Sequence, residues 1–360
     1  MKQNVLVAMS GGVDSSVACV LLKENYNLIG VTLKLHETDE IKLDKTKTCC
    51  SLLDVEDARS VAFALDFPYF VFNFGDKFEE QVINRFTQSY LNGETPNPCI
   101  DCNRYIKFDA LMKRAEQLNQ DYVATGHYAR REYDKESGRY LLKKAKDSSK
   151  DQTYVLYSLT QEQLSKILFP LGDLEKSQVR EIALANGFIN AQKPDSQDIC
   201  FVPNGKYAEF IKQHTKKVIP KGNFIDVSGN VIGTHNGIIS YTVGQRKGLG
   251  IASSEPFYVV EKDPIANTVT LGRENDLYRS DLIANDINWI SIEKLNAPMR
   301  VTAKTRYSQK EQPATITPLN ENEVQVLFDE PQRAITKGQA VVFYDGDRVV
   351  GGGTITQSKI

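Results

Sequence analysis

The sequence has no long hydrophobic run. Its longest apolar stretch, Val17 to Leu22, is far short of the roughly 18 to 20 residues that cross a bilayer. Near the N-terminus, Lys2 is followed by the short apolar run Val5 to Met9 and then by Ser10. An export signal needs an apolar core of about 7 to 15 residues. We therefore expect a cytoplasmic protein with no membrane segment.

The chain also lacks an excess of either charge, and it has few cysteines. Its 44 basic and 46 acidic residues leave a net charge of −2, so any nucleic-acid binding must use a local basic patch. The lysines within 206–221 form one candidate patch, although they could equally be the solvated face of a helix. Six cysteines in 360 residues are too few for a disulfide scaffold and suggest metal, redox or nucleophilic roles.

The length and the change of pattern along the chain predict several domains. A single hydrophobic core stops growing near about 250 to 300 residues, which this chain exceeds. Up to about residue 200, short β-rich runs alternate with helical patterns, which is typical of an α/β fold with a parallel sheet. Beyond about residue 215, short alternating strands predict small barrels or sandwiches, with a seam near Arg279.

The expected elements of the first 200 residues follow from hydrophobic periodicity and turn residues. Strands are expected at 5–9, 28–35, 69–73 and 122–125, and a small hairpin within 132–140. Helices are expected at 13–24, 55–65, 78–91, 106–118, 152–159, 161–168 and 179–186.

A loop rich in glycine and serine, SGGVDSS at residues 10–16, joins the first expected strand to the first expected helix. Glycines let a phosphate approach the backbone, and the N–H groups and dipole of the helix attract it. The loop lacks the lysine of a Walker A motif. The alternative is a simple capped helix after a glycine turn. The string resembles the SGGxDS loop of ATP pyrophosphatases, and this resemblance implies that Asp14 helps to place Mg²⁺.

Three cysteines stand in two further motifs. Cys99 and Cys102 form a C-x-x-C within TPNPCIDCN, and Cys200 lies in DSQDICF. A C-x-x-C can be half of a zinc site, a redox pair or part of a cluster ligand set. A second pair with suitable spacing is missing, which disfavours a structural zinc. The others are expected to be one buried inert thiol and two incidental loop residues, namely Cys19, Cys49 and Cys50.

With SGGVDSS, TPNPCIDCN, ATGHYAR, KDQTY and DSQDICF in this order, the sequence resembles the tRNA-specific 2-thiouridylase family, whose members thiolate the wobble uridine of some tRNAs. VGQRKGLG and KTRY extend the resemblance into the β-rich half. It implies an N-terminal nucleotide α-hydrolase-like, ATP-binding domain at 1–205, with a helical tRNA-contacting part at about 150–190. A small central domain at 206–279 and a C-terminal β-barrel at 280–360 would follow.

The family's chemistry would then run as follows. ATP adenylates the C2 oxygen of uridine U34, and sulfur from a cysteine persulfide replaces it, giving 2-thiouridine, AMP and pyrophosphate. The resemblance implies that Cys200 receives the persulfide and that Cys102 is the nucleophile, leaving a Cys102–Cys200 disulfide. It also implies tRNAs for Glu, Gln and Lys as substrates, and a persulfide carrier or cysteine desulfurase as sulfur source.

The resemblance assigns further residues by their place in these motifs. Expected ATP contacts are Ala8, Met9, Ser10, Gly11, Gly12, Val13, Asp14, Ser15, Leu33 and Gly126. Expected contacts to the target base are Asn97, Pro98 and Cys99. Expected tRNA contacts are His127, Lys150, Asp151, Gln152, Arg306, Tyr307 and Gln339. His127 could instead be a structural histidine, and Arg306 with Tyr307 could be a surface pair on the barrel.

One departure from the family pattern opens an alternative mechanism. Family members often carry Asp where this chain has Cys99, and three thiolates, here Cys99, Cys102 and Cys200, can hold a [4Fe-4S] cluster. Two other classes stay open as well. Another ATP pyrophosphatase, such as an amidating ligase, would need the loop but neither Cys102 nor Cys200. A non-enzymatic RNA-binding module would hold a structural metal.

Overall fold

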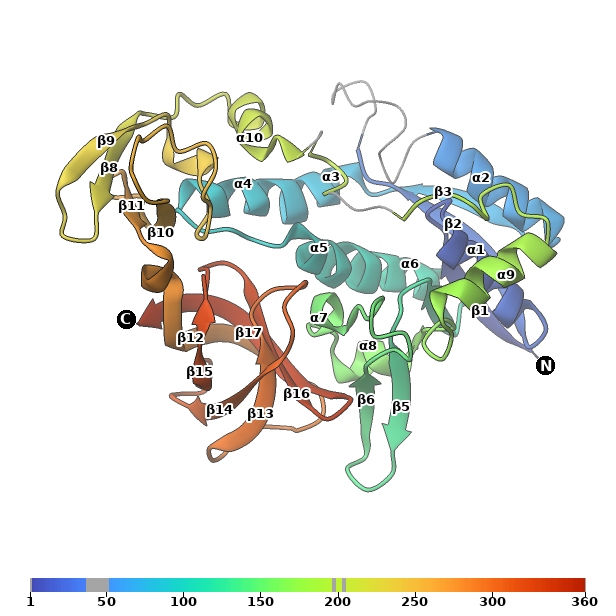
Figure 1. Cartoon of the computed structure of the whole chain (residues 1–360). Coiled ribbons are helices and arrows are strands. Elements are labelled where there is room, and N and C mark those ends of the chain that lie inside the picture. The colour runs from blue at the N-terminus through green and yellow to red at the C-terminus, as the bar shows by residue number, and fades with distance from the viewer. Residues whose placement is uncertain (1, 37–51, 196–198, 203–204, 360) are drawn as a thin grey trace. The chain divides into compact units, whose positions relative to one another are not determined.

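The computed structural model describes residues 2–36, 52–195, 199–202 and 205–359, so Cys49 and Cys50 lie outside the described residues. The chain divides into two compact units (Figure 1). The first unit comprises residues 1–83, 98–205 and 347–350, and the second unit comprises the remaining three segments, 84–97, 206–346 and 351–360. Among the described helices, none is both long and apolar enough to span a membrane.

The first unit is built on a parallel sheet, as the α/β expectation requires. Its strand order is β3-β2-β1-β4-β7. The strands are β1 (Gln3–Ala8), β2 (Tyr26–Lys34), β3 (Tyr69–Asn73), β4 (Tyr122–Thr125) and β7 (Ile167–Leu168). Strand β1 lies between β2 and β4, and Ala8 pairs with Val31 on one side and Thr125 on the other. From β1 the chain continues to β2 and β3 on one side and then crosses to β4 on the other side of β1. Such sheets bind ligands at the carboxyl ends of the strands where the strand order reverses.

Helix α1 (Val13–Lys23) begins directly after the glycine-rich loop. Its buried residues Val13, Val17 and Ala18 recur at helical spacing and join the hydrophobic core with the strands. Helix α9 (Lys176–Ala185) packs against α1 through Val179 and Ala183, and the two lie together in Figure 1. Helix α2 (Leu52–Ala64) belongs to the same unit.

Two helical stretches contain π-helix, which hydrophobic periodicity does not predict. The first runs through α3 (Gly75–Phe78), the π segment η1 (Glu79–Ile83) and α4 (Asn84–Leu91). The second runs through α5 (Pro98–Asp101), the π segment η2 (Cys102–Ala110) and α6 (Leu111–Gln117). The helix expected at 106–118 therefore begins at Pro98, a residue suited to a first helical turn. Cys102 stands where α5 passes into the π segment.

Shorter elements complete the first unit. Strands β5 (Arg130–Asp134) and β6 (Arg139–Lys143) form the expected hairpin, and α7 (Thr153–Leu156) and α8 (Gln161–Ser165) follow it. The helix expected at 161–168 was wrong at its end, because Ile167 and Leu168 pair with Val123 and Ala124 as strand β7. Pairing with a distant strand overrides the local helical pattern there.

The second unit is mostly β structure. After α10 (Tyr207–Thr215) comes a four-stranded sheet of order β10-β11-β8-β9. Its strands are β8 (Gly222–Asp226), β9 (Val231–His235), β10 (Tyr258–Asp263) and β11 (Thr268–Gly272). The C-terminal strands follow the order β12-β15-β14-β13-β16-β17, and β12 also pairs with β17, which closes the expected β-barrel. They are β12 (Tyr278–Trp289), β13 (Met299–Lys304), β14 (Gln312–Pro318), β15 (Val324–Arg333), β16 (Ala340–Asp345) and β17 (Arg348–Lys359). The domain limits at 205 and 279 stay predictions.

Candidate active site

The loop between β1 and α1 is held by its own serine side chains. Ser15 Oγ donates to the Gly12 carbonyl at 3.1 Å, and the Ser10 N–H donates to Ser15 Oγ at 3.2 Å. Gly11 has a φ of 74°, in the left-handed region that favours glycine. The loop thus turns tightly into α1, whose first N–H groups have no partner within the helix and suit an anion.

Two other segments pack against this loop. A Cβ added at Gly126, just after β4, would lie 2.8 Å from Ser15 N, so glycine lets this segment approach the loop. Asn190 Nδ2 donates to the Gly11 carbonyl at 2.9 Å. The expected ATP contacts are thereby gathered at the carboxyl edge of the sheet: Ala8, Met9, Ser10, Gly11, Gly12, Val13, Asp14, Ser15 and Gly126, with Leu33 near the end of β2.

Changing Gly11 to alanine is expected to lower thermal stability and weaken ATP binding by at least tenfold. The new Cβ would press on the backbone of Asp54, in addition to the cost of a positive φ. Gly138→Ala is the matched control, because Gly138 also has a positive φ, of 67°, but has nothing within 4 Å of an added Cβ. Calorimetric ATP titration and thermal unfolding check the prediction, and equal effects of the two substitutions would contradict it.

Asp14 is surrounded by donors. Tyr128 Oη donates to Asp14 Oδ1 at 2.7 Å, and Lys176 Nζ reaches its two oxygens at 2.7 and 2.8 Å. Burial and the neighbouring Asp14 raise the pKa of Tyr128, so the phenol stays protonated. Mg²⁺ is commonly bound by one or two carboxylates together with substrate phosphates. Asp14 fits that role as a single ligand once Lys176 yields one of its oxygens.

The cysteines of the two motifs differ in exposure. Cys99, in α5, is exposed, whereas Cys102 and Cys200 are half-buried, and all three are thiols. Cys19 is buried in α1 as expected, and burial raises its pKa, which suits an inert thiol. In the described part of the chain, no group of three or more His, Cys, Asp or Glu side chains is placed to hold a metal ion. Cys99, Cys102 and Cys200 are therefore not gathered as a cluster ligand set in this structure.

Among the expected base contacts, Asn97 is half-buried and Pro98 is buried at the start of α5. Asn97 belongs to the second unit, while Pro98 and Cys99 belong to the first.

His127 follows Gly126 but is turned into the protein. It is 9% exposed, and its Nδ1 lies 2.8 Å from Thr125 Oγ1. Phe108 and Phe169 pack around its ring. Burial lowers the pKa of His127 well below its usual range, so the ring is neutral at pH 7. These contacts are those of a structural histidine, the alternative considered for this residue.

The segment Lys150–Gln152 is tied to its own unit by all three side chains. Lys150 Nζ donates to Asp195 at 2.8 Å. Asp151 accepts from the Ala145 N–H at 3.0 Å, and Gln152 Oε1 accepts from the Tyr128 N–H at 2.8 Å. Asp151 and Gln152 thus shape this loop, and Lys150, about one-third exposed, presents the charge.

In the second unit, the three remaining expected tRNA contacts line one pocket. Its volume is about 250 Å³, and its other lining residues are polar: Thr95, Thr242, Ser308 and Thr336. Arg306 is fixed by the carbonyls of Val243 and Ala334 and by Thr336 Oγ1, at 2.8 to 3.1 Å. Tyr307 is 43% exposed, so its ring is accessible for stacking.

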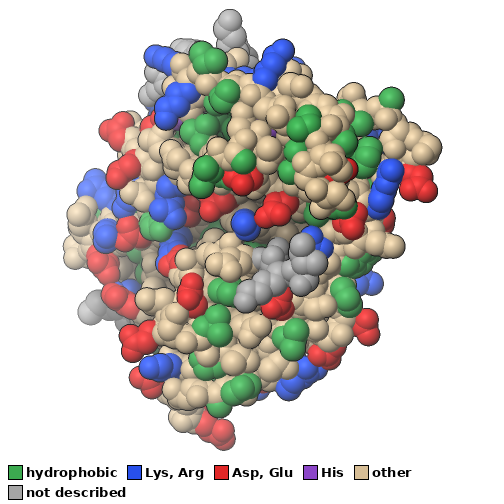
Figure 2. All heavy atoms as spheres, turned by 90° about the vertical axis from the view of Figure 1, so that its left-hand side faces the viewer, with side chains coloured by type: hydrophobic (Ala, Val, Ile, Leu, Met, Phe, Trp, Pro, Cys, Tyr) green, Lys and Arg blue, Asp and Glu red, His purple; other side chains and the backbone are tan. Residues whose placement is uncertain are grey.

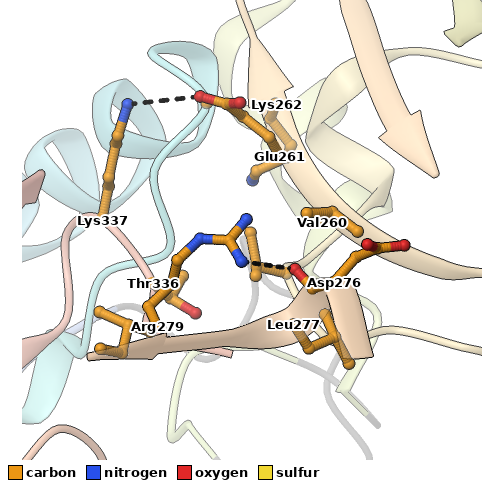
Figure 3. A pocket seen from close by; sticks show the side chains of 11 residues that line it. Val260, Glu261, Lys262, Asp276, Leu277, Arg279, Thr336 and Lys337 are labelled. Atoms are coloured by element: carbon orange, nitrogen blue, oxygen red, sulfur yellow. Dashed lines mark hydrogen bonds and ion pairs between the residues drawn. The ribbon is translucent and has the colours of Figure 1, made fainter. Parts of the chain in front are cut away.

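A second cavity, of about 50 Å³, lies nearby in the same unit and is shown in Figure 3. Two of its lining residues, Lys337 and Glu261, form an ion pair at 3.9 Å, and Arg279 donates to the Asp276 carbonyl at 2.7 Å. Lys262, in β10, is 6% exposed and donates to the carbonyls of Glu94 and Tyr241 at 3.3 and 3.0 Å. Burial lowers its pKa to about 8, against the opposing effect of Glu94.

Surface charge does not single out one binding face. On the face drawn in Figure 2, Lys and Arg side chains are interspersed with Asp and Glu, in keeping with the net charge of −2. Lys206, within the candidate basic patch, pairs with Glu209 at 3.4 Å.

The sequence motifs did not identify two lysines of the first unit that pair with carboxylates in or near the loop at residues 10–16. Lys176, at the start of α9, contacts Asp14 although the two are 162 residues apart. Lys193 similarly reaches Asp54 and Asp57 of α2 at 2.6 and 2.7 Å. A lysine at a helix start carries no local signal for such a partner, so only the fold reveals it.

Three family models together match most of the chain. A family model described as tRNA methyl transferase HUP domain matches residues 3–204, its PRC-barrel counterpart matches 208–273, and a model described as aminomethyltransferase beta-barrel domain matches 279–355. The solved structure of a predicted tRNA methyltransferase subunit from Methanocaldococcus jannaschii is similar with a TM-score of 0.33 and 16% identity, covering 60% of this chain and 90% of that one.

Curated relatives match this chain from end to end. The tRNA-specific 2-thiouridylase MnmA of Clostridioides difficile is 55% identical over 359 residues, which cover 99% of each chain. The protein of the same name from Acetivibrio thermocellus is 56% identical over 356 residues, covering 98% of this chain and 99% of that one. With this identity and coverage, the chain belongs to the tRNA-specific 2-thiouridylase family.

Proposed function

We propose that this chain is a tRNA 2-thiouridylase, an ATP-dependent sulfurtransferase that acts on the wobble uridine U34. One observation carries the proposal. A phosphate loop at the switch point of a parallel sheet shares a compact unit with Cys102 and Cys200, in a chain that matches thiouridylases over its full length.

The first step activates the base. The C2 oxygen of uridine attacks the α-phosphorus of ATP, the bond to the bridging oxygen breaks, and pyrophosphate leaves. The loop 9–12 and the first N–H groups of α1 suit the charge of the leaving pyrophosphate. Mg²⁺, when bound, would neutralise phosphate charge, and Asp14 is the carboxylate of the loop that would hold it. The C2 oxygen now leaves as AMP instead of as oxide.

The second step delivers sulfur. A persulfide carrier or cysteine desulfurase would load Cys200 with a terminal sulfur. The Cys102 thiolate then attacks Cys200 Sγ, which forms a Cys102–Cys200 disulfide and releases hydrosulfide. Hydrosulfide adds at C2, AMP departs, and a proton is lost to give 2-thiouridine. An external thiol reductant supplies the two electrons that restore both thiols.

An iron–sulfur route is the competing proposal for the same product. It would need Cys99, Cys102 and Cys200 as three ligands of one cluster, and the described residues do not form such a set. The persulfide route needs only Cys102 and Cys200, and we propose it as the leading mechanism.

Each unit offers groups for tRNA. In the first unit, Lys150 presents a charge suited to phosphate, and in the second unit Arg306 and Tyr307 line a pocket large enough for part of a nucleotide. We extend the proposal to the tRNAs for Glu, Gln and Lys, which the family resemblance implies.

The test is a reconstituted reaction. The protein, purified without oxygen, is supplied with unmodified tRNA, ATP, Mg²⁺ and a persulfide donor, and nucleosides are quantified by mass spectrometry. We expect one pyrophosphate and one AMP for each 2-thiouridine, and no product without ATP. An amidating ligase would give no 2-thiouridine. Iron content measured on the same sample separates the routes, because activity that rises in proportion to iron would favour the cluster.

A further inference from the structure

Asn190 is tied to two carbonyl groups of the phosphate loop at residues 10–16. Its Nδ2 donates to the Gly11 carbonyl at 2.9 Å and to Ser16 Oγ at 3.0 Å. Ser16 Oγ in turn donates to the Gly12 carbonyl at 3.1 Å. One amide group therefore serves both glycine carbonyls, the first directly and the second through a serine.

The amide of Asn190 acts at this position through its hydrogens. The residue is 2% exposed, and its Oδ1 has no hydrogen-bond partner among the residues that the structure describes. A carbonyl oxygen can only accept, so the group that faces the Gly11 carbonyl is the NH₂ of the amide. Leaving a buried amide oxygen without a partner costs free energy. The bonds that Nδ2 makes to the loop must offset this cost.

The turn that carries Asn190 is anchored in the core of the first unit. Phe188 and Ala191, on either side of it, are buried in the hydrophobic core together with residues of α1 and α9. The Ala191 N–H donates to the Phe188 carbonyl at 3.1 Å, and the Lys193 N–H donates to the Asn190 carbonyl at 3.0 Å. The amide therefore reaches the loop from a fixed piece of backbone.

Lys193 adds a positive charge near the same loop carbonyl. Its Nζ lies 3.5 Å from the Gly11 carbonyl oxygen and pairs with Asp54 and Asp57 of α2 at 2.6 and 2.7 Å. Burial opposes the charge, but the hydrogen bonds to the two carboxylates outweigh it and raise the pKa of Lys193, so the ammonium stays charged. The Gly11 carbonyl thus faces donors of two side chains.

Fixing the Gly11 carbonyl also sets the direction of the next N–H group. The peptide group is planar and trans, so the Gly11 carbonyl and the Gly12 N–H point in opposite directions. The Gly12 N–H points toward the exposed Ser10, and its distance to Ser10 Oγ, 3.4 Å, is long for a hydrogen bond. A phosphate oxygen would give this N–H a shorter, charge-assisted bond.

We infer that Asn190 is a positioning residue for polyphosphate binding, which holds the Gly11 carbonyl toward the core and keeps the Gly12 N–H directed at the phosphates. A peptide between two glycines meets little steric resistance to turning over. If it turned, its carbonyl oxygen would face the phosphates and repel them. The inference rests on the proposed function for the identity of the ligand, ATP.

Calorimetric titration with inorganic pyrophosphate, ATP and adenosine, each with Mg²⁺, tests the inference. Asn190→Leu removes both donors at a similar side-chain volume and removes the unpaired Oδ1 with them, so folding is expected to persist. Its affinity for pyrophosphate and for ATP is expected to fall at least tenfold, because the Gly11–Gly12 peptide is no longer held. Its affinity for adenosine, which has no phosphate, is expected to stay within twofold.

Asn103→Leu is the matched control. Asn103 is also 2% exposed, donates through Nδ2 to a backbone carbonyl, that of Val155 at 2.9 Å, and has an Oδ1 without a partner in the described part of the chain. Its carbonyl partner does not belong to the phosphate loop. This variant is therefore expected to lose a similar amount of thermal stability and to bind pyrophosphate as the unaltered protein does.

Asn190→Asp provides a second variant at the same position. It keeps the shape of the side chain but places a carboxylate oxygen, which cannot donate, against the Gly11 carbonyl. The same loss of pyrophosphate and ATP binding is expected, and this variant decides the question if Asn190→Leu does not fold.

The inference is overturned if a folded Asn190 variant binds pyrophosphate as tightly as the unaltered protein, or if the unaltered protein does not bind pyrophosphate. An equal loss of adenosine affinity, or an equal loss of pyrophosphate affinity in Asn103→Leu, would also overturn it, because either result indicates general damage. The proposed function fails separately, when the reconstituted reaction forms no 2-thiouridine although pyrophosphate binding still depends on Asn190.

Discussion

Serine in place of Cys102 or Cys200 is expected to lower 2-thiouridine formation by roughly 10³-fold or more, as when other enzymes lose their nucleophile. A serine hydroxyl can neither carry a terminal sulfur nor accept a disulfide bond. Activation of the base does not use either thiol, so both variants are expected to release about one pyrophosphate per active site and then stop. A burst measurement of pyrophosphate beside a mass-spectrometric assay of 2-thiouridine separates the two steps.

Two other cysteines provide the controls for this series. Cys19→Ser removes a buried thiol of α1 that takes no part in the chemistry, and it tests the effect of losing a thiol on folding alone. Cys99→Ala distinguishes the two routes, because the persulfide route predicts that most activity is kept. The cluster route would be established instead if the variants at Cys99, Cys102 and Cys200 all lost thiolation and the unaltered protein contained bound iron.

The second unit is expected to gain stability between pH 7.5 and 9.5 because of Lys262. Its pKa of about 8 in the folded protein lies below the value of about 10.4 in an unfolded chain. Between these values the unfolded state binds a proton that the folded state has released, so the free energy of unfolding rises with pH. Below pH 8 both states are protonated and the slope vanishes. The expected rise is about 2 kcal/mol over this interval.

Trp289, the single tryptophan, lies in β12 and reports on this unit. Urea unfolding followed by its fluorescence at the two pH values measures the rise, and Lys262→Met is expected to abolish it because methionine does not titrate. Lys294→Met, which removes an exposed lysine of the same unit, should retain the rise. If Lys262→Met and the unaltered protein showed the same pH dependence, the buried ammonium would not be its source.

The loop at residues 10–16 could be predicted from the sequence because its signals are local. Glycine and serine spacing after an apolar run places the turn between β1 and α1, and the structure has α1 beginning at Val13 as expected. Short strands separated by turn residues predicted small barrels or sandwiches, and the family resemblance implied the barrel that the structure has. Gly126 could be assigned only through the family resemblance, and its closeness to Ser15 is a property of the folded sheet.

Other features depend on contacts between distant residues, which local patterns do not encode. The Lys176–Asp14 contact joins helix α9 to the phosphate loop, and no spacing rule connects them. The π segment that begins at Cys102 shifts the helical phase. A search for 3.6-residue periodicity therefore detects only the later part of the helical stretch that begins at Pro98. The packing of the His127 ring against Phe108 and Phe169 is likewise a property of the fold that its motif does not encode, and its tRNA contact stays a prediction.

The segments of the two units alternate along the sequence, so both units are synthesised in parts on the ribosome. The first unit includes residues 347–350, and the second unit includes 84–97 as well as 351–360. Neither unit has all of its residues until nearly the entire chain has been translated, which takes tens of seconds at about 5 to 20 residues per second. The nascent sheet of β1 to β4 must therefore persist while the barrel strands emerge. The last segment of the first unit, 347–350, is synthesised only after most of the second unit.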